Sequence, residues 1–475
     1  MFNWQQLLHS QRIGGENRGS KEFAFDSDYK RIVTSPAFRR LQDKTQVFPL
    51  ERHDFVHTRL THSIEVAMLA RELATNIIQY YKGEDAPILN ERKEDICRIL
   101  ECASLLHDIG NPPFGHFGED IIRHWFASHL APMLQQKMLE NINIEYFLAH
   151  YLSDFIEFDG NAQALRIITK LHNFSGDPGM HLTAATINTM IKYTRSSTEA
   201  YDKQNAKLVE KKMGYFQAEQ KIFEKVTALT GVEKARHPLT FILEAADDIA
   251  YLTADIEDAL KKELFSFDFF KQKLTEFNQQ WENLKDPKDN DKNKYLNEVH
   301  KQQTKNQEDG NQEELINQCF FDIRKKLIYA ASFSFNHHYS AIMQGNYNAD
   351  LFKGSWAETL HKFLRQFALK HIFSNKHILK LEISGHSVLT FLLNKFVAAV
   401  LPYADLNNIH NKLDKKLVAL ISESHKQIYQ RFATKHQDDP HYLLYLRLLM
   451  VTDFISGMTD SYAHDLYTTL SGYHI

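Results

Sequence analysis

The chain has 475 residues, of which 43 % are hydrophobic and 24 % are charged, and its formal net charge is −4. This length excludes a small module held together by disulfides, and it is enough for one large core or for two or three smaller ones. The slightly negative charge excludes polyanion binding as a general property of the surface, although a local basic pocket is compatible with it.

Cysteine usage and hydropathy favour a cytoplasmic protein. The three cysteines form no CxxC pair and no plausible disulfide framework. The first residues are polar and lack the basic and apolar segments of a signal peptide, and the longest apolar run, near 397–401, is short enough to be helix core. We therefore expect a reducing compartment and no membrane contact.

Apolar residues recur with helical spacing along most of the chain, and they predict an all-α fold. Residues 96–106 and 241–249 are two such segments. Alternating strand patterns are scarce, and the chain holds only 18 glycines and 11 prolines. Glycine and proline predict helix ends at 110–113, 176–179 and 401–402, because neither residue continues a helix well.

Composition divides the chain into three predicted regions. An N-terminal region, 1–282, carries the residues with the strongest chemical signal, and a C-terminal helical region covers 315–475. Residues 283–314 between them are rich in Lys, Asp, Asn, Gln and Glu, which predicts a polar loop or insertion. The sequence leaves open whether the C-terminal region is a separate domain or part of the same core.

Two histidines and two aspartates form a candidate metal site. His62 lies in one predicted helix, His107 and Asp108 end a second, and Asp247 lies in a third. Adjacent helical side chains point about 100° apart, so His107 and Asp108 can reach one ion only near a helix end, which 110–113 supplies. Two imidazoles and two carboxylates can hold a divalent cation and leave positions for water and phosphate oxygens.

A single His-Asp pair is more often a hydrogen-bonded helix end than a pair of ligands, and the chain has 25 histidines. The apolar helix before His107 and the glycine-rich exit after Asp108 favour the metal interpretation. His124, His150 and His172 lack paired spacing, so we expect them to be ordinary polar or core histidines.

His116 and Glu119 form a second candidate pair just after this helix end. On a helical turn their spacing places the carboxylate beside the imidazole, where it can orient the ring for proton transfer or for in-line attack at phosphorus. The alternative is a glycine turn with a helix-capping acid. Proximity to the metal pair favours catalysis.

Four segments of the first half, in order, match one family: 38–49, 58–63, 106–119 and 244–251. On these segments the chain resembles the HD-domain deoxynucleoside triphosphate triphosphohydrolases, most closely the bacterial deoxyguanosinetriphosphate triphosphohydrolases (dGTPases). The resemblance implies a helical HD core at about 59–255 and hydrolysis of dGTP to deoxyguanosine and inorganic triphosphate, which contributes to control of dNTP pools.

The resemblance also implies the roles of the candidate residues. The metal ligands would be His62, His107, Asp108 and Asp247, with His116 and Glu119 as the catalytic pair. Asp247 is preferred over its neighbour Asp248 because the family's metal aspartate stands four residues before an aromatic residue, here Tyr251; Asp248 stays the alternative. We expect Mg or Mn as the cation, and Fe or Co are also compatible with these ligand types.

Five further positions match the family's substrate-binding residues. Arg59 and Lys192 would bind phosphates, Tyr251 would pack where a ribose 2′-hydroxyl would sit, and Gln46 and Asp255 would contact the 3′-hydroxyl. A triphosphate needs such cations, and an aromatic ring excludes a hydroxyl sterically. Taken alone, Arg59 and Lys192 could be solvated helix charges and Tyr251 a half-buried core aromatic.

Two other functions stay open at this point. One is a triphosphohydrolase of broad dNTP specificity, and the other is a nucleic-acid-binding HD regulator without turnover. The intact candidate residues argue against lost chemistry, and the charge balance argues against a dominant nucleic-acid surface. From the family likeness we also expect a homo-oligomer, such as a hexamer, with single-stranded DNA as a candidate effector.

Overall fold

The fold is almost entirely helical, which confirms the predicted all-α class. The computed structural model describes residues 1–14, 23–48, 50, 56–137, 139, 141–174, 177–200, 202, 206–282, 312–403, 405–406 and 408–473. Of the predicted polar loop at 283–314, residues 283–311 lie outside this part of the chain, as does Gly176 of a predicted helix end. Residues 312–314 begin a helix.

The helices before the predicted polar loop are α1 (Trp4–Leu7), α2 (Ala24–Val33), α3 (Pro36–Arg40), α4 (Arg59–Tyr80), α5 (Ala86–Glu91), α6 (Lys93–Leu106), α7 (Gly115–Lys137), α8 (Ile144–Ile156), α9 (Gly160–Arg166), α10 (Ala184–Met190), α11 (Gln220–Thr230), α12 (Pro238–Lys261) and α13 (Phe267–Glu282). Those after it are α15 (Gln312–His337), α16 (Tyr339–Met343), α17 (Glu358–Ala368), α18 (Lys376–Val400), α19 (Lys412–Leu420), α20 (Glu423–Ala433), α21 (Pro440–Ser456) and α22 (Asp460–Ser471).

Short elements complete the described part of the chain. Strands β1 (Asn173–Phe174) and β2 (Asp177–Pro178) pair antiparallel, whereas β3 (Arg195–Ser196) and β4 (Met213–Tyr215) pair in parallel. Single turns of 3-10 helix are η2 (Leu41–Asp43), η4 (Leu208–Glu210) and η5 (Gln217–Glu219), and two π-helical turns, η3 (Ile167–Leu171) and η6 (Leu369–Phe373), continue α9 and α17.

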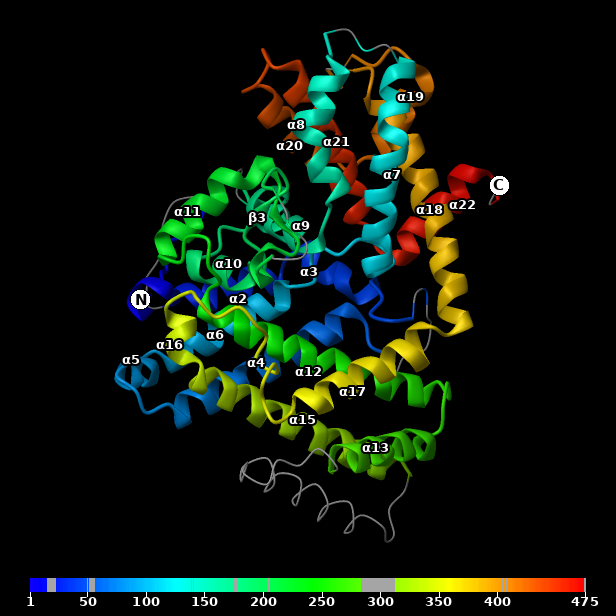
Figure 1. Cartoon of the computed structure of the whole chain (residues 1–475). Helices are drawn as coiled ribbons and strands as arrows, with labels where there is room; N and C mark the ends of the chain where they lie inside the picture. Colours follow the sequence, from blue (N-terminus) through cyan, green and yellow to red (C-terminus); the bar gives the residue numbers. More distant parts are fainter. Residues whose placement is uncertain are drawn as a thin grey trace.

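Two hydrophobic cores interleave along the sequence. In the first, α4 packs against α6, α12 and α15, and α12 also contacts α17. In the second, α7 packs against α8 and α18, and α18 contacts α19, α21 and α22. Figure 1 shows the first set of helices at the bottom of the molecule and the second at the top. Helices from both sides of 283–311 therefore build the first core, and the predicted domain boundaries stay a prediction.

Local sequence explains where the helices near the candidate site begin and end. Thr58 caps the start of α4. Its hydroxyl accepts a hydrogen bond from the backbone N–H of Thr61, and the hydroxyl of Thr61 accepts one from the backbone N–H of Thr58. Helix α6 ends at Leu106, a few residues before the predicted stop at 110–113, and α18 ends at Val400, directly before the stop at 401–402. A Cβ on Gly110 would lie 2.0 Å from the carbonyl oxygen of Gly160, so only glycine lets α9 approach this turn.

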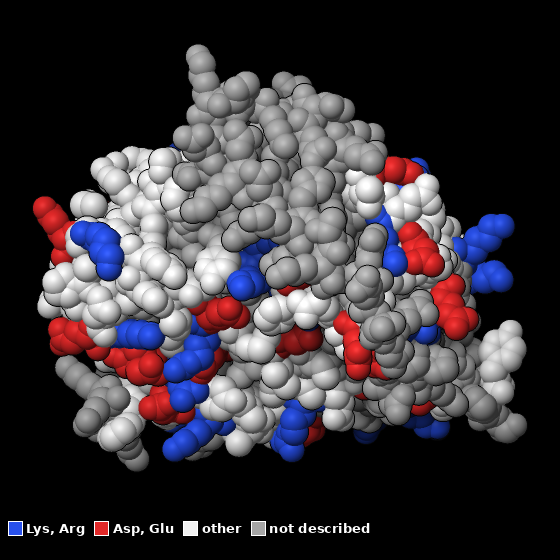
Figure 2. All heavy atoms as spheres, turned by 90° about the horizontal axis from the view of Figure 1, so that it is seen from below, with Lys and Arg blue, Asp and Glu red and all other residues white. Residues whose placement is uncertain are grey.

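One described helical segment, Ile378–Val400 in α18, is long and apolar enough to cross a membrane by length and composition alone. Half of its most apolar window is buried inside the protein. Its buried residues, among them Leu392, Leu393 and Phe396, belong to the second core, as those of a core helix would. On the face seen in Figure 2, acidic and basic side chains of the described residues lie interspersed.

A buried ion-pair cluster joins the two halves of the chain. Arg166 on α9 donates to Asp453 on α21, at 2.7 Å from both Nε and Nη2, and to Glu219 at 2.9 Å. All three side chains are almost completely buried. Removal of one charge would leave its partners buried without compensation.

We therefore expect Asp453→Ala to lower the free energy of unfolding by about 3–5 kcal/mol, since Arg166 would lose its bidentate partner. Urea denaturation measures this change. The matched control is Glu94→Ala, which breaks the exposed Arg71–Glu94 pair and should cost less than about 1 kcal/mol. Equal losses in the two variants would contradict the expectation.

Candidate metal centre and active site

Three helices bring His62, His107 and Asp247 together. His62 lies in the first turn of α4, His107 caps the end of α6, and Asp247 lies in the middle of α12. One potential ligand atom from each side chain lies within 4.8 Å of the other two. Asp247 Oδ1 is 3.1 Å from His62 Nε2 and 3.5 Å from His107 Nε2. Three of the four predicted ligands thus converge on one point.

Asp108, the fourth predicted ligand, lies at the edge of this cluster. Its Oδ2 is 3.5 Å from His107 Nε2 and accepts a hydrogen bond from Arg59 Nη1 at 2.5 Å. Its Oδ1 accepts from the side-chain amide of Asn111 at 2.6 Å. The predicted phosphate-binding Arg59 therefore pairs with a predicted metal ligand in this structure.

The donor set fits a divalent cation. His107 Nδ1 donates to the carbonyl of Ser104 at 2.6 Å, which leaves the lone pair of Nε2 directed at the cluster. Within the described part of the chain this buried Nε2 has no hydrogen-bond partner. Burial lowers the pKa of His107, but the carboxylates of Asp108 and Asp247 outweigh it and raise the pKa to about 9. The site therefore favours added positive charge.

Asp247 and Asp248 point to different partners. Asp247 faces the two histidines, whereas Asp248 Oδ2 lies 3.1 Å from Nε2 of His361 on α17. This placement supports Asp247 as the ligand, and its role in metal binding stays a prediction.

His116 and Glu119 are paired as the sequence predicts. His116 Nδ1 donates to Glu119 Oε2 at 3.2 Å, and the other carboxylate oxygen accepts from the backbone N–H of Gly160 at 2.8 Å. The Glu119 side chain is 2 % exposed, whereas that of His116 is 75 % exposed. The hydrogen bond that His116 donates to Glu119 raises the pKa of His116. A fixed carboxylate thus orients an accessible imidazole.

The predicted substrate residues on α12 share one face with the metal aspartate. Asp247, Tyr251 and Asp255 follow one another at intervals of four residues, which stacks them along one side of a helix. Tyr251 is half-buried and Asp255 is buried, and burial raises the pKa of both groups.

The other predicted substrate residues come from separate segments. Lys192 Nζ lies 3.2 Å from Glu244 Oε1, and Glu244 also accepts from Arg236 at 2.5 Å. Burial alone would lower the pKa of Lys192. Nearby negative groups, of which the carboxylate of Glu244 contributes most, together outweigh burial, so the pKa is raised and this lysine stays charged. The side-chain oxygen of Gln46 is buried and has no hydrogen-bond partner among the described residues, so it is available to a ligand.

Sequence reasoning missed a half-buried histidine, His57, beside the site. His57 Nδ1 donates to Asp258 Oδ1 at 2.8 Å, its backbone N–H donates to Asp258 Oδ2 at 2.9 Å, and its Nε2 lies 3.3 Å from Glu65. These contacts fasten the start of α4 to α12, the two helices that carry His62 and Asp247. No sequence motif points to His57. The sequence offered one indirect signal, which is that its partner Asp258 continues the buried face of α12.

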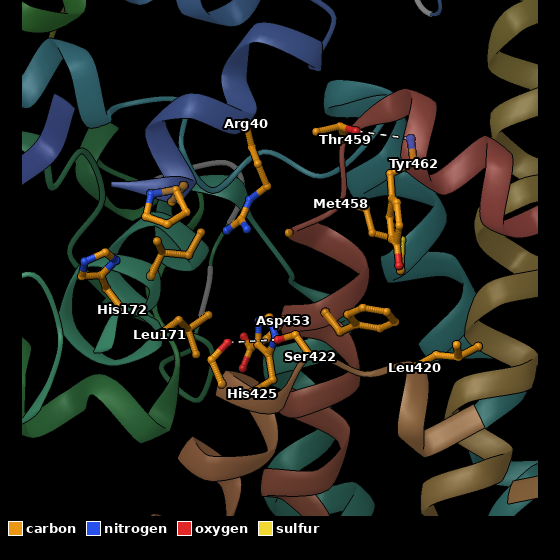
Figure 3. Close-up of a pocket in the computed structure, with 16 residues that line it drawn as sticks. Arg40, Leu171, His172, Leu420, Ser422, His425, Asp453, Met458, Thr459 and Tyr462 are labelled. Atoms are coloured by element: carbon orange, nitrogen blue, oxygen red, sulfur yellow. Dashed lines mark hydrogen bonds between the residues drawn. The ribbon is translucent and has the colours of Figure 1, made fainter. Parts of the chain in front are cut away.

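A cavity of about 630 Å³ lies between α3 and the helices α20 to α22. Arg40 extends into it from α3 toward Asp453 and His425, while Thr459 and Tyr462 line its upper edge (Figure 3). None of the predicted metal, catalytic or substrate residues lines this cavity.

Comparisons with known proteins agree with this geometry. A family model described as HD domain matches residues 59–251. The chain is 40 % identical to the deoxyguanosinetriphosphate triphosphohydrolase-like protein of Listeria monocytogenes, over 99 % of this chain and all of that protein. It is 34 % and 32 % identical to the deoxyguanosinetriphosphate triphosphohydrolases of Serratia proteamaculans and Yersinia pseudotuberculosis, in each case over 94 % of this chain and 93 % of the relative.

The His57 contacts predict a pH dependence of stability. Hydrogen bonds from the His57 ring to the carboxylates of Asp258 and Glu65 raise the pKa of His57 from 6.5 to about 10. The folded state therefore holds this proton more tightly than the unfolded state, so the added stability is complete below pH 6.5 and is lost as pH rises toward 10.

We expect His57→Gln to flatten the fall in unfolding free energy across this pH range, as measured by urea denaturation at several pH values. The exposed His150 provides the control, and His150→Gln should keep the wild-type slope. An unchanged slope in His57→Gln would show that other groups set the pH dependence.

Proposed function

The chain belongs to the family of HD-domain deoxyguanosinetriphosphate triphosphohydrolases, and on this basis we propose that it hydrolyses dGTP to deoxyguanosine and inorganic triphosphate. The observation that carries the proposal is the convergence of His62, His107 and Asp247 from three helices, and the His116–Glu119 pair follows His107 closely in the sequence. A metal site beside an oriented imidazole suits hydrolysis of a phosphate ester.

The proposed ligands are His62, His107, Asp108 and Asp247, and the proposed cation is Mg or Mn, with Fe or Co as alternatives. A bound cation would stabilise negative charge on the α-phosphate and favour the attacking water. The buried, unpartnered Nε2 of His107 supports this assignment. Arg59, which neutralises Asp108 in the structure, would turn to the triphosphate when a cation takes its place.

We assign proton transfer to His116. Attack of water at the α-phosphorus breaks the bond to the 5′-oxygen, which leaves as deoxyguanosine and needs a proton. Glu119 accepts a hydrogen bond from His116 and raises the pKa of this imidazole, which favours the protonated form that can supply the proton. Direct attack by His116 at phosphorus is the alternative, and it requires the deprotonated ring.

Substrate selection would follow from the remaining residues. Arg59 and Lys192 supply positive charge for the triphosphate, and both are held by carboxylates in the structure. The ring of Tyr251 would exclude a 2′-hydroxyl. The unpartnered oxygen of Gln46 and the buried Asp255 would bind the 3′-hydroxyl, and a site of this kind rejects analogues that lack it.

Three further predictions rest on family likeness alone: a contribution to control of dNTP pools, assembly into a homo-oligomer such as a hexamer, and a response to single-stranded DNA. A cytoplasmic location is proposed from the cysteine usage and hydropathy of the sequence.

The function is tested by incubating the Mn-loaded protein with each dNTP and with GTP, and by quantifying nucleoside and triphosphate by ion-exchange chromatography. We expect equimolar deoxyguanosine and triphosphate, dGTP as the fastest substrate, and negligible turnover of GTP. His116→Ala should lower kcat by about 100-fold or more, whereas His150→Ala, at an exposed histidine, should not. Release of phosphate or pyrophosphate would contradict the proposed reaction, and equal turnover of all four dNTPs would favour broad specificity.

The neighbouring aspartates allow a matched test of the metal site. Loss of a residue that only orients a ligand weakens metal binding by about 10- to 100-fold, so loss of a ligand in Asp247→Asn should weaken Mn²⁺ binding by at least about 100-fold. Asp248→Asn, which removes only the partner of His361, should bind Mn²⁺ like the wild type. Equilibrium dialysis followed by mass spectrometry of the metal measures both. The reverse result would transfer the ligand role to Asp248.

A further inference from the structure

Two buried charged residues, Lys44 and Asp460, have no part in the reaction described above. Their residues are 3 % and 2 % exposed. They lie more than 400 positions apart, Lys44 after η2 and Asp460 in the first turn of α22. Each side chain forms hydrogen bonds with backbone groups that lie within three residues of a predicted active-site residue in the sequence.

The carboxylate of Asp460 holds two backbone segments at once. Its Oδ2 accepts from the backbone N–H of Thr45 at 3.0 Å, and its Oδ1 accepts from the backbone N–H of Phe114 at 3.0 Å. Thr45 directly precedes Gln46, and Phe114 stands two residues before His116. One side chain therefore fixes the backbone next to a predicted substrate contact and next to the predicted proton donor.

The segment before His116 needs such a restraint. Phe114 has a φ of 64° and Gly115 a φ of 59°, so two successive residues are in the left-handed region. For an aromatic residue this conformation is strained, and it persists only where surrounding contacts hold it. The bond from Phe114 to Asp460 is such a contact. The Phe114 ring also packs against Gly385 on α18, where a Cβ would lie 2.8 Å from the ring.

Lys44 ties the same turn to the end of α21. Its Nζ donates to the carbonyl of Asn111 at 2.5 Å and to the carbonyl of Ser456 at 2.9 Å. The side chain of Asn111 in turn donates to Asp108 at 2.6 Å. Burial lowers the pKa of Lys44 to about 7, because a charged amino group is costly to bury, and both carbonyls accept hydrogen bonds from this amino group.

We propose that Asp460, assisted by Lys44, is a positioning residue that sets the backbone before His116 and Gln46, so that helices α21 and α22 complete the active site. This inference rests on the proposed function. The joint between η2 and α22 also contains a contact without such a role: the exposed Ser461 donates to Asp43 at 2.8 Å and bonds to neither turn of the active site.

The test uses the full-length, Mn-loaded protein and compares Asp460→Asn with Ser461→Ala. The asparagine keeps the shape of Asp460, but its amide nitrogen cannot accept a hydrogen bond. One of the two backbone N–H groups, of Thr45 or Phe114, therefore loses its partner. We expect kcat for dGTP to fall by about 10- to 100-fold, with a smaller change in KM and with wild-type Mn²⁺ content. Ser461→Ala should keep kcat within about twofold, since it loosens the same joint without touching either turn.

Melting temperature and near-ultraviolet circular dichroism establish the folded fraction of each variant. If Asp460→Asn does not fold, Asp460→Glu replaces it, because this variant retains both acceptors but shifts them by one methylene. The proposal is overturned if a folded Asp460 variant keeps wild-type kcat, if Ser461→Ala loses as much activity, or if neither Asp460 variant folds. Wild-type activity on dGTP tests the proposed function separately. If the wild type prefers another dNTP, the same ratios are measured on that substrate.

Discussion

The site depends on the close packing of α4, the end of α6 and α12, which brings His62, His107 and Asp247 together and leaves the carboxylate of Asp108 at the edge of the cluster. Carboxylates gathered in a weakly hydrated interior must be neutralised, because burial of an unpaired charge is expensive. In this structure Arg59 and the histidines supply the positive charge. A divalent cation would do so more compactly and would free Arg59 for a substrate. The same electrostatic demand thus links metal binding to phosphate recognition.

Lys192, the second predicted phosphate-binding residue, is also held in place by a carboxylate. Glu244 lies between Lys192 and Arg236, so one carboxylate serves two cations, and Lys192 remains charged although it is largely buried. A lysine held in this manner does not have to be ordered when a polyanion arrives, which lowers the cost of binding. Both predicted phosphate contacts are therefore fixed by protein carboxylates rather than left as mobile surface charges.

Local patterns explain which parts of this arrangement could be predicted from the sequence. The helical class, the helix end after His107 and the His116–Glu119 pair all follow from spacing within a few residues, and the structure agrees with them. The family likeness favoured Asp247 over Asp248, but the contact of Asp248 with His361 could not be predicted, because His361 lies more than 100 residues away. Contacts such as His57 with Asp258 and Lys44 with Ser456 join distant segments without a shared motif, so no periodicity could reveal them.

The candidate site lies between the two cores, so the C-terminal helices can affect its geometry. The predicted metal ligands project from helices of the first core, whereas His116 and Glu119 belong to α7, which packs into the second. A shift of one core against the other would therefore move His116 relative to His62, His107 and Asp247. The Arg166–Asp453 pair, the Lys44 side chain and the bond from Thr45 to the Asp460 carboxylate all cross this junction. Because each is buried and directional, they resist such a shift more specifically than apolar contacts, which tolerate sliding.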